Sequence, residues 1–199
     1  MATIRVSNSD TFFYQQFFIN LQPILCTIRQ VNKSTIMTNE PIFQTLDSLN
    51  IPYKIQEHKA IFSEEDAKDV VITLEGIDVK NLFVKDRNHN YGLVSMDLHR
   101  RADLKKIATQ FGFGRLSFCN PDELMQYLNI TPGSVSPLCL MYDTNCAVKV
   151  LYDQSFENHN VIIHPLRNTA SISLKFDDLK RFTEHFGHKW MTGDLYKEE

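Results

Sequence analysis

The stretch KNLFVKDRNHNYGLVSM, residues 80–96, is the best guide to the fold of this chain. Its apolar runs, residues 81–85 and 92–96, are short and rich in branched and aromatic side chains, which is typical of β-strands. The residues between them include one Asp and two Asn, which tolerate the backbone angles of tight turns. The stretch therefore predicts two strands joined by a turn.

Helices and strands alternate on either side of this pair. Helices are expected where caps and breakers bound a periodic segment, over residues 41–49, 103–110, 121–128 and 177–186. Asn39 is the expected cap of the first helix, and Ser63 with Asp66 forms a capping box that predicts a further short one. Further strands are expected over residues 53–58, 138–142, 147–152, 161–164 and 171–174. This order predicts a single α+β sheet domain.

The bulk composition fits one globular domain. With 199 residues, 43% of them hydrophobic and 23% charged, the chain is long enough to bury a sizeable core. Its four cysteines, Cys26, Cys119, Cys139 and Cys146, form neither a dense disulfide framework nor a Cys-x-x-Cys metal pair. We expect free, mostly buried thiols in a reducing compartment, and neither a metal nor a cofactor.

Residues 1–36 differ in character from the rest of the chain. They are rich in hydroxyl and amide side chains, and residues 11–28 carry no charge, which is a feature of membrane spans. The amides of Gln15, Gln16, Asn20 and Gln22 argue against a span because burying them in hydrocarbon is costly. A transit peptide and a working start at Met37 are the alternatives.

The expected domain limits follow from this change in composition. Residues 1–36 are expected to be an extension that is poorly ordered or outside the functional domain, residues 37–190 the domain, and residues 191–199 a C-terminal tail. We expect a cytoplasmic protein without stable membrane association.

Three separated segments carry a family resemblance when they are taken together: residues 80–83 (Lys-Asn-Leu-Phe), residues 133–137 (Gly-Ser-Val-Ser-Pro), and His164-Pro165-Leu166 followed by Asn168. With residues 58–67, they resemble the prolyl-tRNA editing proteins of the YbaK/ProX superfamily, freestanding hydrolases that clear wrongly charged tRNA. The resemblance runs from about Pro41 to Trp190 and is closest to the branch that removes alanine from tRNA for proline. It implies a mixed, barrel-like sheet flanked by helices.

The resemblance also implies roles for the first segment. Lys80 is expected to contact the phosphate or ribose of the terminal adenosine, for which a compact cation with three donors is suited. Asn81 is expected to hold a hydroxyl or the amino group of the substrate through its amide. Taken alone, Lys80 would be a solubilising edge residue and Asn81 a residue that satisfies nearby backbone groups.

The segment from Gly133 to Pro137 has little bulk, so its backbone N–H groups can approach a ligand closely. The resemblance places the aminoacyl carbonyl here, with Ser134, Val135, Ser136 and Pro137 as substrate-binding residues. Relatives commonly carry threonine where this chain has Ser136, which leaves the size limit of the pocket open. Without the resemblance the segment would be a helix-to-strand connector.

His164 ends an apolar run, where a lone histidine is usually a structural, hydrogen-bonded residue. The resemblance implies instead that it lines the amino-acid pocket and orients water or substrate, with His58 and Asn168 as secondary candidates. It also implies that a hydroxyl of the terminal ribose of the tRNA assists the attack of water.

The net charge of −3 offers no overall attraction to a polyanion such as tRNA. Positive charge is local: residues 99–106 hold four basic residues against one acidic one. Such a run is usually a solvated helix face, but in one cleft it could hold an acceptor stem. The candidate tRNA-binding residues are Lys85, Arg87, Arg100 and Arg101.

Alanine is the first choice of aminoacyl group, because a synthetase pocket sized for proline rejects a smaller side chain weakly. Cysteine and serine come next. The expected partner is mischarged tRNA for proline, with prolyl-tRNA synthetase and the elongation machinery as further candidates. Three rivals stay open: a catalytically silent module that binds tRNA or the synthetase, an esterase or amidase with a cysteine nucleophile, and a membrane-tethered protein.

Overall fold

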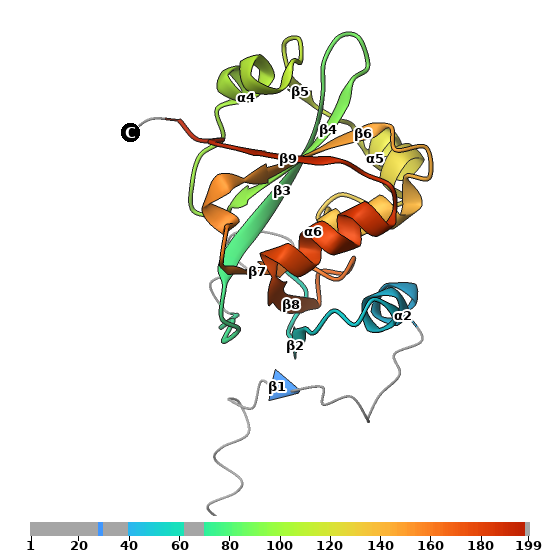
Figure 1. Ribbon diagram of the computed structural model, residues 1–199, viewed down its shortest axis with the longest axis vertical. Helices are drawn as coiled ribbons and strands as arrows, with labels where there is room; N and C mark the ends of the chain where they lie inside the picture. Colours follow the sequence, from blue (N-terminus) through green and yellow to red (C-terminus); the bar gives the residue numbers. More distant parts are fainter. Residues whose placement is uncertain (1–27, 30–39, 62–69, 198–199) are drawn as a thin grey trace, which may run out of the picture.

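The computed structural model describes residues 28–29, 40–61 and 70–197 (Figure 1). These residues form one mixed sheet with the strand order β1-β2-β8-β7-β3-β4-β6-β9, and β5 pairs separately with β3. The strands are β1 (Ile28–Arg29), β2 (Lys54–Glu57), β3 (Ile77–Lys85), β4 (Tyr91–Asp97), β5 (Ser117–Phe118), β6 (Val148–Asp153), β7 (Asn160–Ile163), β8 (Ala170–Lys175) and β9 (Trp190–Gly193).

The predicted pair of strands forms the centre of the sheet. β3 and β4 are antiparallel, with Asn81 opposite Ser95 and Lys85 opposite Tyr91. Parallel neighbours flank the pair, because β7 runs alongside the start of β3 and β6 runs alongside β4. The expected α+β domain with a mixed sheet flanked by helices is therefore confirmed.

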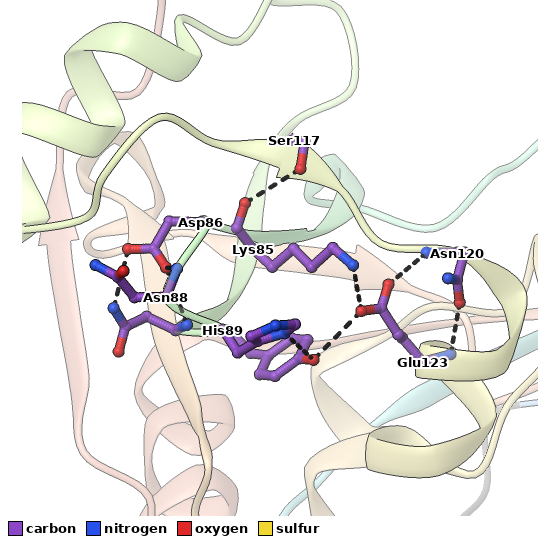
Figure 2. A network of polar contacts seen from close by, with 9 residues as sticks. Lys85, Asp86, Asn88, His89, Ser117, Asn120 and Glu123 are labelled. Atoms are coloured by element: carbon purple, nitrogen blue, oxygen red, sulfur yellow. Dashed lines mark hydrogen bonds and ion pairs between the residues drawn. The ribbon is translucent and has the colours of Figure 1, made fainter.

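The turn between β3 and β4 is built around Asp86, which is 3% exposed (Figure 2). Its carboxylate accepts the backbone N–H groups of Asn88 at 2.8 Å, Asn90 at 3.1 Å and Gly114 at 2.9 Å. A bond from the Asn90 side chain, together with these backbone bonds, holds the pKa of Asp86 well below its usual range.

Helices cover both faces of the sheet. The larger core lies on the face covered by α2 (Pro41–Ser48), α5 (Pro121–Leu128), α6 (Phe176–His185) and the 3-10 helix η1 (Pro137–Tyr142). A smaller core lies under α4 (Leu104–Phe111), where Ile107 packs near Val84 and Leu195. A short 3-10 helix, η2 (Gln154–Phe156), follows β6. No helix in the described parts of the chain is long and apolar enough to cross a membrane.

Two local predictions are wrong. Residues 138–142 form η1 rather than a strand, because Ser136 caps the N–H of Leu138 and Pro137 occupies the first helical position. The N-cap of α2 is Glu40, which makes no side-chain cap bond, rather than Asn39.

The C-terminal boundary expected at residue 190 is too early. β9 pairs with β6 through residue 193, and Tyr196 forms a bridge with Ala102. Figure 1 shows this chain running past the sheet toward α4. Residues 191–197 are thus part of the fold.

Other predictions lie outside the described residues. They include the helix expected at Ser63, the thiol of Cys26, and residues 1–36 except Ile28 and Arg29, which pair with β2. Among the described thiols only Cys139 is buried, so the expectation of mostly buried cysteines does not hold for them.

Candidate functional site

The candidate site lies at a break in the pairing of β3. On one side β4 pairs with β3 continuously from Val79 to Lys85. On the other side β7 pairs only with residues 77–78 and β5 only with residues 84–85. Among the strands that the structure describes, none pairs with residues 79–82 on this side. Lys80 and Asn81 lie within this break, with their side chains on opposite faces because side chains alternate along a strand.

His164 directly follows β7, the strand that borders this break. Asp78 of β3 is opposite Ile162 of β7 in the last pair between the two strands, and Asp78 is among the charges that act on His164. The next residues form a tight turn in which Leu166 has a φ of 62°. A leucine with a left-handed backbone is unusual and indicates a turn held in place by its surroundings.

The chemistry of His164 follows from its contacts. Its Nδ1 lies 3.2 Å from the carbonyl oxygen of Ala170, and since a carbonyl only accepts, Nδ1 carries the proton. Burial, opposed by this bond and reinforced by His58, lowers the pKa of His164. The imidazole is therefore neutral near pH 7, and Nε2 is left as a hydrogen-bond acceptor.

His58 and Asn168 stand beside His164. The rings of His58 and His164 are 6.3 Å apart, and Nε2 of His58 lies 3.1 Å from the hydroxyl of Ser171. The side-chain amide of Asn168 donates to the carbonyl of Ile61 at 3.3 Å, and the backbone carbonyl of Asn168 accepts the N–H of Ile61 at 3.1 Å. Asn168 thus joins the segment after β2 to the turn that follows His164.

Lys80 is held by backbone carbonyls. Its ammonium donates to the carbonyl oxygens of Leu98, at 3.0 Å, and Arg100. Partial burial lowers the pKa of Lys80, opposed by the charge of Asp97. Because an ammonium has three donors, one remains for a ligand.

Asn81 connects β3 to the glycine loop, residues 133–137. Its amide donates to the carbonyl oxygen of Val135 at 3.0 Å and accepts the hydroxyl of the buried Ser95 at 2.7 Å. Both ends of the side chain are occupied, so in this state Asn81 positions the loop.

The glycine loop needs Gly133 because the backbone there has a positive φ, which favours glycine. Gly133 has a φ of 87°, and a Cβ added there would meet nothing within 4 Å. The N–H of Ser134 donates to Thr131, whereas the N–H groups of Val135 and Ser136 donate to no described residue. Ser136 and Pro137 are buried. The loop can therefore offer the N–H of the half-buried Val135 to a ligand, while Ser136 and Pro137 shape its exit.

A pocket of about 1130 Å³ opens on the Lys80 face of β3. Its walls come from residues 101–106 at the start of α4 and from the C-terminal segment at Tyr196 and Lys197. Five basic residues line it against one acidic residue, Asp103: Lys80, Arg101, Lys105, Lys106 and Lys197. Asp103 caps α4 by accepting the N–H groups of Lys105 and Lys106, at 3.0 and 3.1 Å. The pocket is suited to an anion.

The structure separates the four predicted tRNA-binding residues into two pairs. Arg101 lines the pocket, and Arg100 stacks at 4.0 Å on the Tyr196 ring. Lys85 lies at the other end of β3 in an ion pair with Glu123 (Figure 2). Arg87 is exposed in the turn beyond it.

Lys105, Lys197 and Phe118 were not among the predicted site residues. Two long-range pairings bring them to the pocket. Residues 101–103 pair with the C-terminal segment, which places Lys105 and Lys197 together, and β5 pairs with β3, which places Phe118. Sequence patterns contain no direct signal for either pairing. The basic run at residues 99–106 was the one available indication of this pocket.

The thiols weigh against a cysteine nucleophile. Burial raises the pKa of Cys119 and of Cys139 to about 12, so both are protonated at neutral pH. Cys146 is exposed and points its thiol at the carbonyl of Phe186 at 3.5 Å. Within the described part of the chain, no three His, Cys, Asp or Glu side chains are grouped so as to hold a metal ion.

Comparison with known proteins gives a consistent result. The family model described as the aminoacyl-tRNA editing domain matches residues 58–182. The chain is 31% identical over 160 residues to the prolyl-tRNA editing protein ProX of Acetoanaerobium sticklandii, a match that covers 78% of this chain and 96% of that protein. It is 31% identical over 151 residues to the prolyl-tRNA synthetase associated domain-containing protein 1 of Bos taurus, covering 73% of this chain and 88% of the relative.

A solved structure of a candidate trans-editing enzyme for prolyl-tRNA synthetase has the same fold. It superposes with a TM-score of 0.61 at 19% identity and covers 81% of this chain and 100% of that one.

Proposed function

This chain belongs to the aminoacyl-tRNA editing domain family, and from that premise we propose that it is a deacylase that acts in trans on mischarged tRNA for proline, with Ala-tRNA(Pro) as its preferred substrate. The name of the bacterial relative supports prolyl-tRNA as the substrate class. The observation that carries the proposal is that Lys80 lies in the break in β3, the glycine loop is bonded to the adjacent Asn81, and His164 follows β7, the strand that borders the break. The proposal also specifies the aminoacyl group that is removed, which is alanine rather than cysteine or serine.

Lys80 and its basic neighbours bind the terminal nucleotide. The free donor of Lys80 contacts a phosphate or the ribose of the terminal adenosine, and the pocket beside it supplies further positive charge. The aminoacyl group then extends through the break toward the glycine loop.

In the proposed reaction, water adds to the ester carbonyl carbon. The charge that develops on the carbonyl oxygen is stabilised by the N–H of Val135, which donates to no described residue. The bond from the carbonyl carbon to the ribose oxygen breaks, and that oxygen takes a proton, which releases alanine and intact tRNA. The neighbouring ribose hydroxyl assists the attack of water.

His164 orients the substrate in this scheme. Its neutral Nε2 can accept a hydrogen bond from the attacking water or from the ammonium group of alanine. A protonated imidazole would repel that ammonium group. The lowered pKa of His164 therefore favours binding at neutral pH.

The proposal is tested by measuring alanine release from Ala-tRNA(Pro) by the wild type and by Lys80→Met. Loss of one charge-assisted contact, about 1.5–3 kcal/mol, should slow single-turnover hydrolysis at subsaturating enzyme by about 10-fold to 150-fold. Lys175→Met, an exposed lysine at the end of β8, is the matched control and should hydrolyse normally. Equal rates for Lys80→Met and the wild type would contradict the assigned site.

A further inference from the structure

Phe118 is an exposed aromatic side chain of the basic pocket to which the proposed reaction gives no role. It lies on the edge strand β5 and is 61% exposed. Phe118 is paired with Val84, and paired residues share a face of the sheet. Alternation along β3 puts Lys80, Leu82 and Val84 on one face, so Phe118 lies on the side of Lys80 and lines the same pocket.

The surroundings of Phe118 are cationic. Arg101, Lys105 and Lys197 line the pocket, are exposed, and form no ion pair with any residue in the described ranges, whereas Lys106 is paired with Asp194 at 2.6 Å. A flat exposed ring next to unpaired cations is the combination that binds single-stranded nucleic acid, because bases stack on the ring and phosphates meet the cations.

The length of the pocket fits more than one nucleotide. Phe118 stands beside Val84, four residues along β3 from Lys80, which is roughly 13 Å at the usual rise of a strand. A base at Phe118 therefore belongs to a different nucleotide from the one that Lys80 contacts.

We propose that Phe118 is a stacking platform for a base of the single-stranded 3′ end of the tRNA, upstream of the terminal adenosine, with Arg101, Lys105 and Lys197 on the adjoining phosphates. This inference rests on the proposed function, since it takes the terminal nucleotide to be at Lys80. It explains how a chain of net charge −3 can hold a polyanion through one local surface.

The test uses binding of an unacylated RNA, so it needs no hydrolysis. A fluorescein-labelled single-stranded RNA ending in CCA is titrated with the full chain, and the Kd is read from fluorescence anisotropy. Phe118→Leu should weaken binding by about tenfold, while Phe118→Trp should bind at least as tightly as the wild type. Met125→Ala, which removes another exposed apolar side chain, is the control and should have no effect.

A second RNA identifies the contact. If the two nucleotides before the terminal adenosine lack bases, the wild type should bind as weakly as Phe118→Leu, and the substitution should cause no further loss. Equal binding of the CCA RNA by Phe118→Leu and the wild type would overturn the platform. So would a substitution that weakens binding of the abasic RNA as much as it weakens binding of the intact RNA.

Hydrolysis separates this inference from the proposed function. Phe118→Leu should raise KM for Ala-tRNA(Pro) and leave kcat unchanged. If the RNA binds in a way that depends on its bases but no ester is hydrolysed, the stacking role of Phe118 is supported and the proposed deacylase function is wrong. If Phe118→Leu hydrolyses Ala-tRNA(Pro) with the KM and kcat of the wild type, the deacylase function is supported and the stacking role of Phe118 is wrong.

Discussion

The protonation state of His164 follows from its burial and its neighbours. Burial holds its pKa below the ordinary 6.5, with His58 acting in the same direction. Lowering the pH protonates the imidazole only below 6.5, so the neutral form persists throughout the neutral range. We expect the ring resonance of His164, assigned by comparison with His164→Gln, to titrate in NMR with a midpoint below 6.5. A midpoint at or above 6.5 would contradict the lowered pKa, and only a midpoint above neutral pH would remove Nε2 as an acceptor there.

Gly133 tests whether the loop conformation serves catalysis. Alanine at this position meets no neighbouring atom, so its cost is the left-handed backbone alone, about 1–2 kcal/mol of unfolding free energy. Gly112, the C-cap of α4, has a φ of 68° and equally open surroundings, which makes Gly112→Ala a matched control. Urea unfolding should give similar losses for both variants. Only Gly133→Ala should also slow deacylation, and equal rates for the two variants would contradict the role of the loop.

At the scale of elements, the turn between β3 and β4 depends on an ionised Asp86. Its folded-state pKa is lowered, so its contribution to stability is present above the unfolded pKa of about 3.9 and is lost as the pH falls. Asp86→Asn replaces one acceptor oxygen with an amide that faces donors. The urea midpoint of the variant should lie below that of the wild type at pH 7, with the gap narrowing at pH 3. An equal gap at both values would show that the charge is irrelevant.

Elements bounded by local signals were predictable from the sequence. Pro121 begins α5 and Gly112 ends α4, and both helices match the expected ranges closely. The apolar residues 138–142 have the composition of a strand, and the Ser136-Pro137 helix start was the signal that could have corrected the interpretation. β9 was missed because four residues carry little pattern and their partner β6 is distant in sequence.

The candidate site was predictable only in part, for a physical reason. Motifs identified Lys80, Asn81 and His164, but the break that brings them together arises from where β5 and β7 stop pairing with β3. Such long-range register is not encoded in local patterns. Alternation along the strand does predict that Lys80 and Asn81 face opposite ways, which divides the site into a nucleotide side and a loop side.

At the scale of the whole molecule, the C-terminal segment completes both the smaller core and the basic pocket. Leu195 is fully buried in that core, next to Ile107 and Val84. Leu195→Ala should lower the unfolding free energy by about 3 kcal/mol. Met191→Ala, at a position that is 36% exposed, should change it by only about 0.5 kcal/mol. Urea unfolding of both variants is the measurement. If Leu195→Ala leaves the unfolding free energy unchanged, residues 191–197 are a tail and do not belong to the folded domain.

The central claim is that this molecule hydrolyses alanine from tRNA for proline and spares the correct amino acid. The most direct measurement is release of labelled amino acid from alanyl-, prolyl- and cysteinyl-tRNA(Pro) by the wild-type chain under identical conditions. We predict rapid release of alanine, slower release of cysteine, and prolyl-tRNA(Pro) left intact. If all three esters survive while the tRNA still binds, the protein is a silent binding module and the claim is wrong.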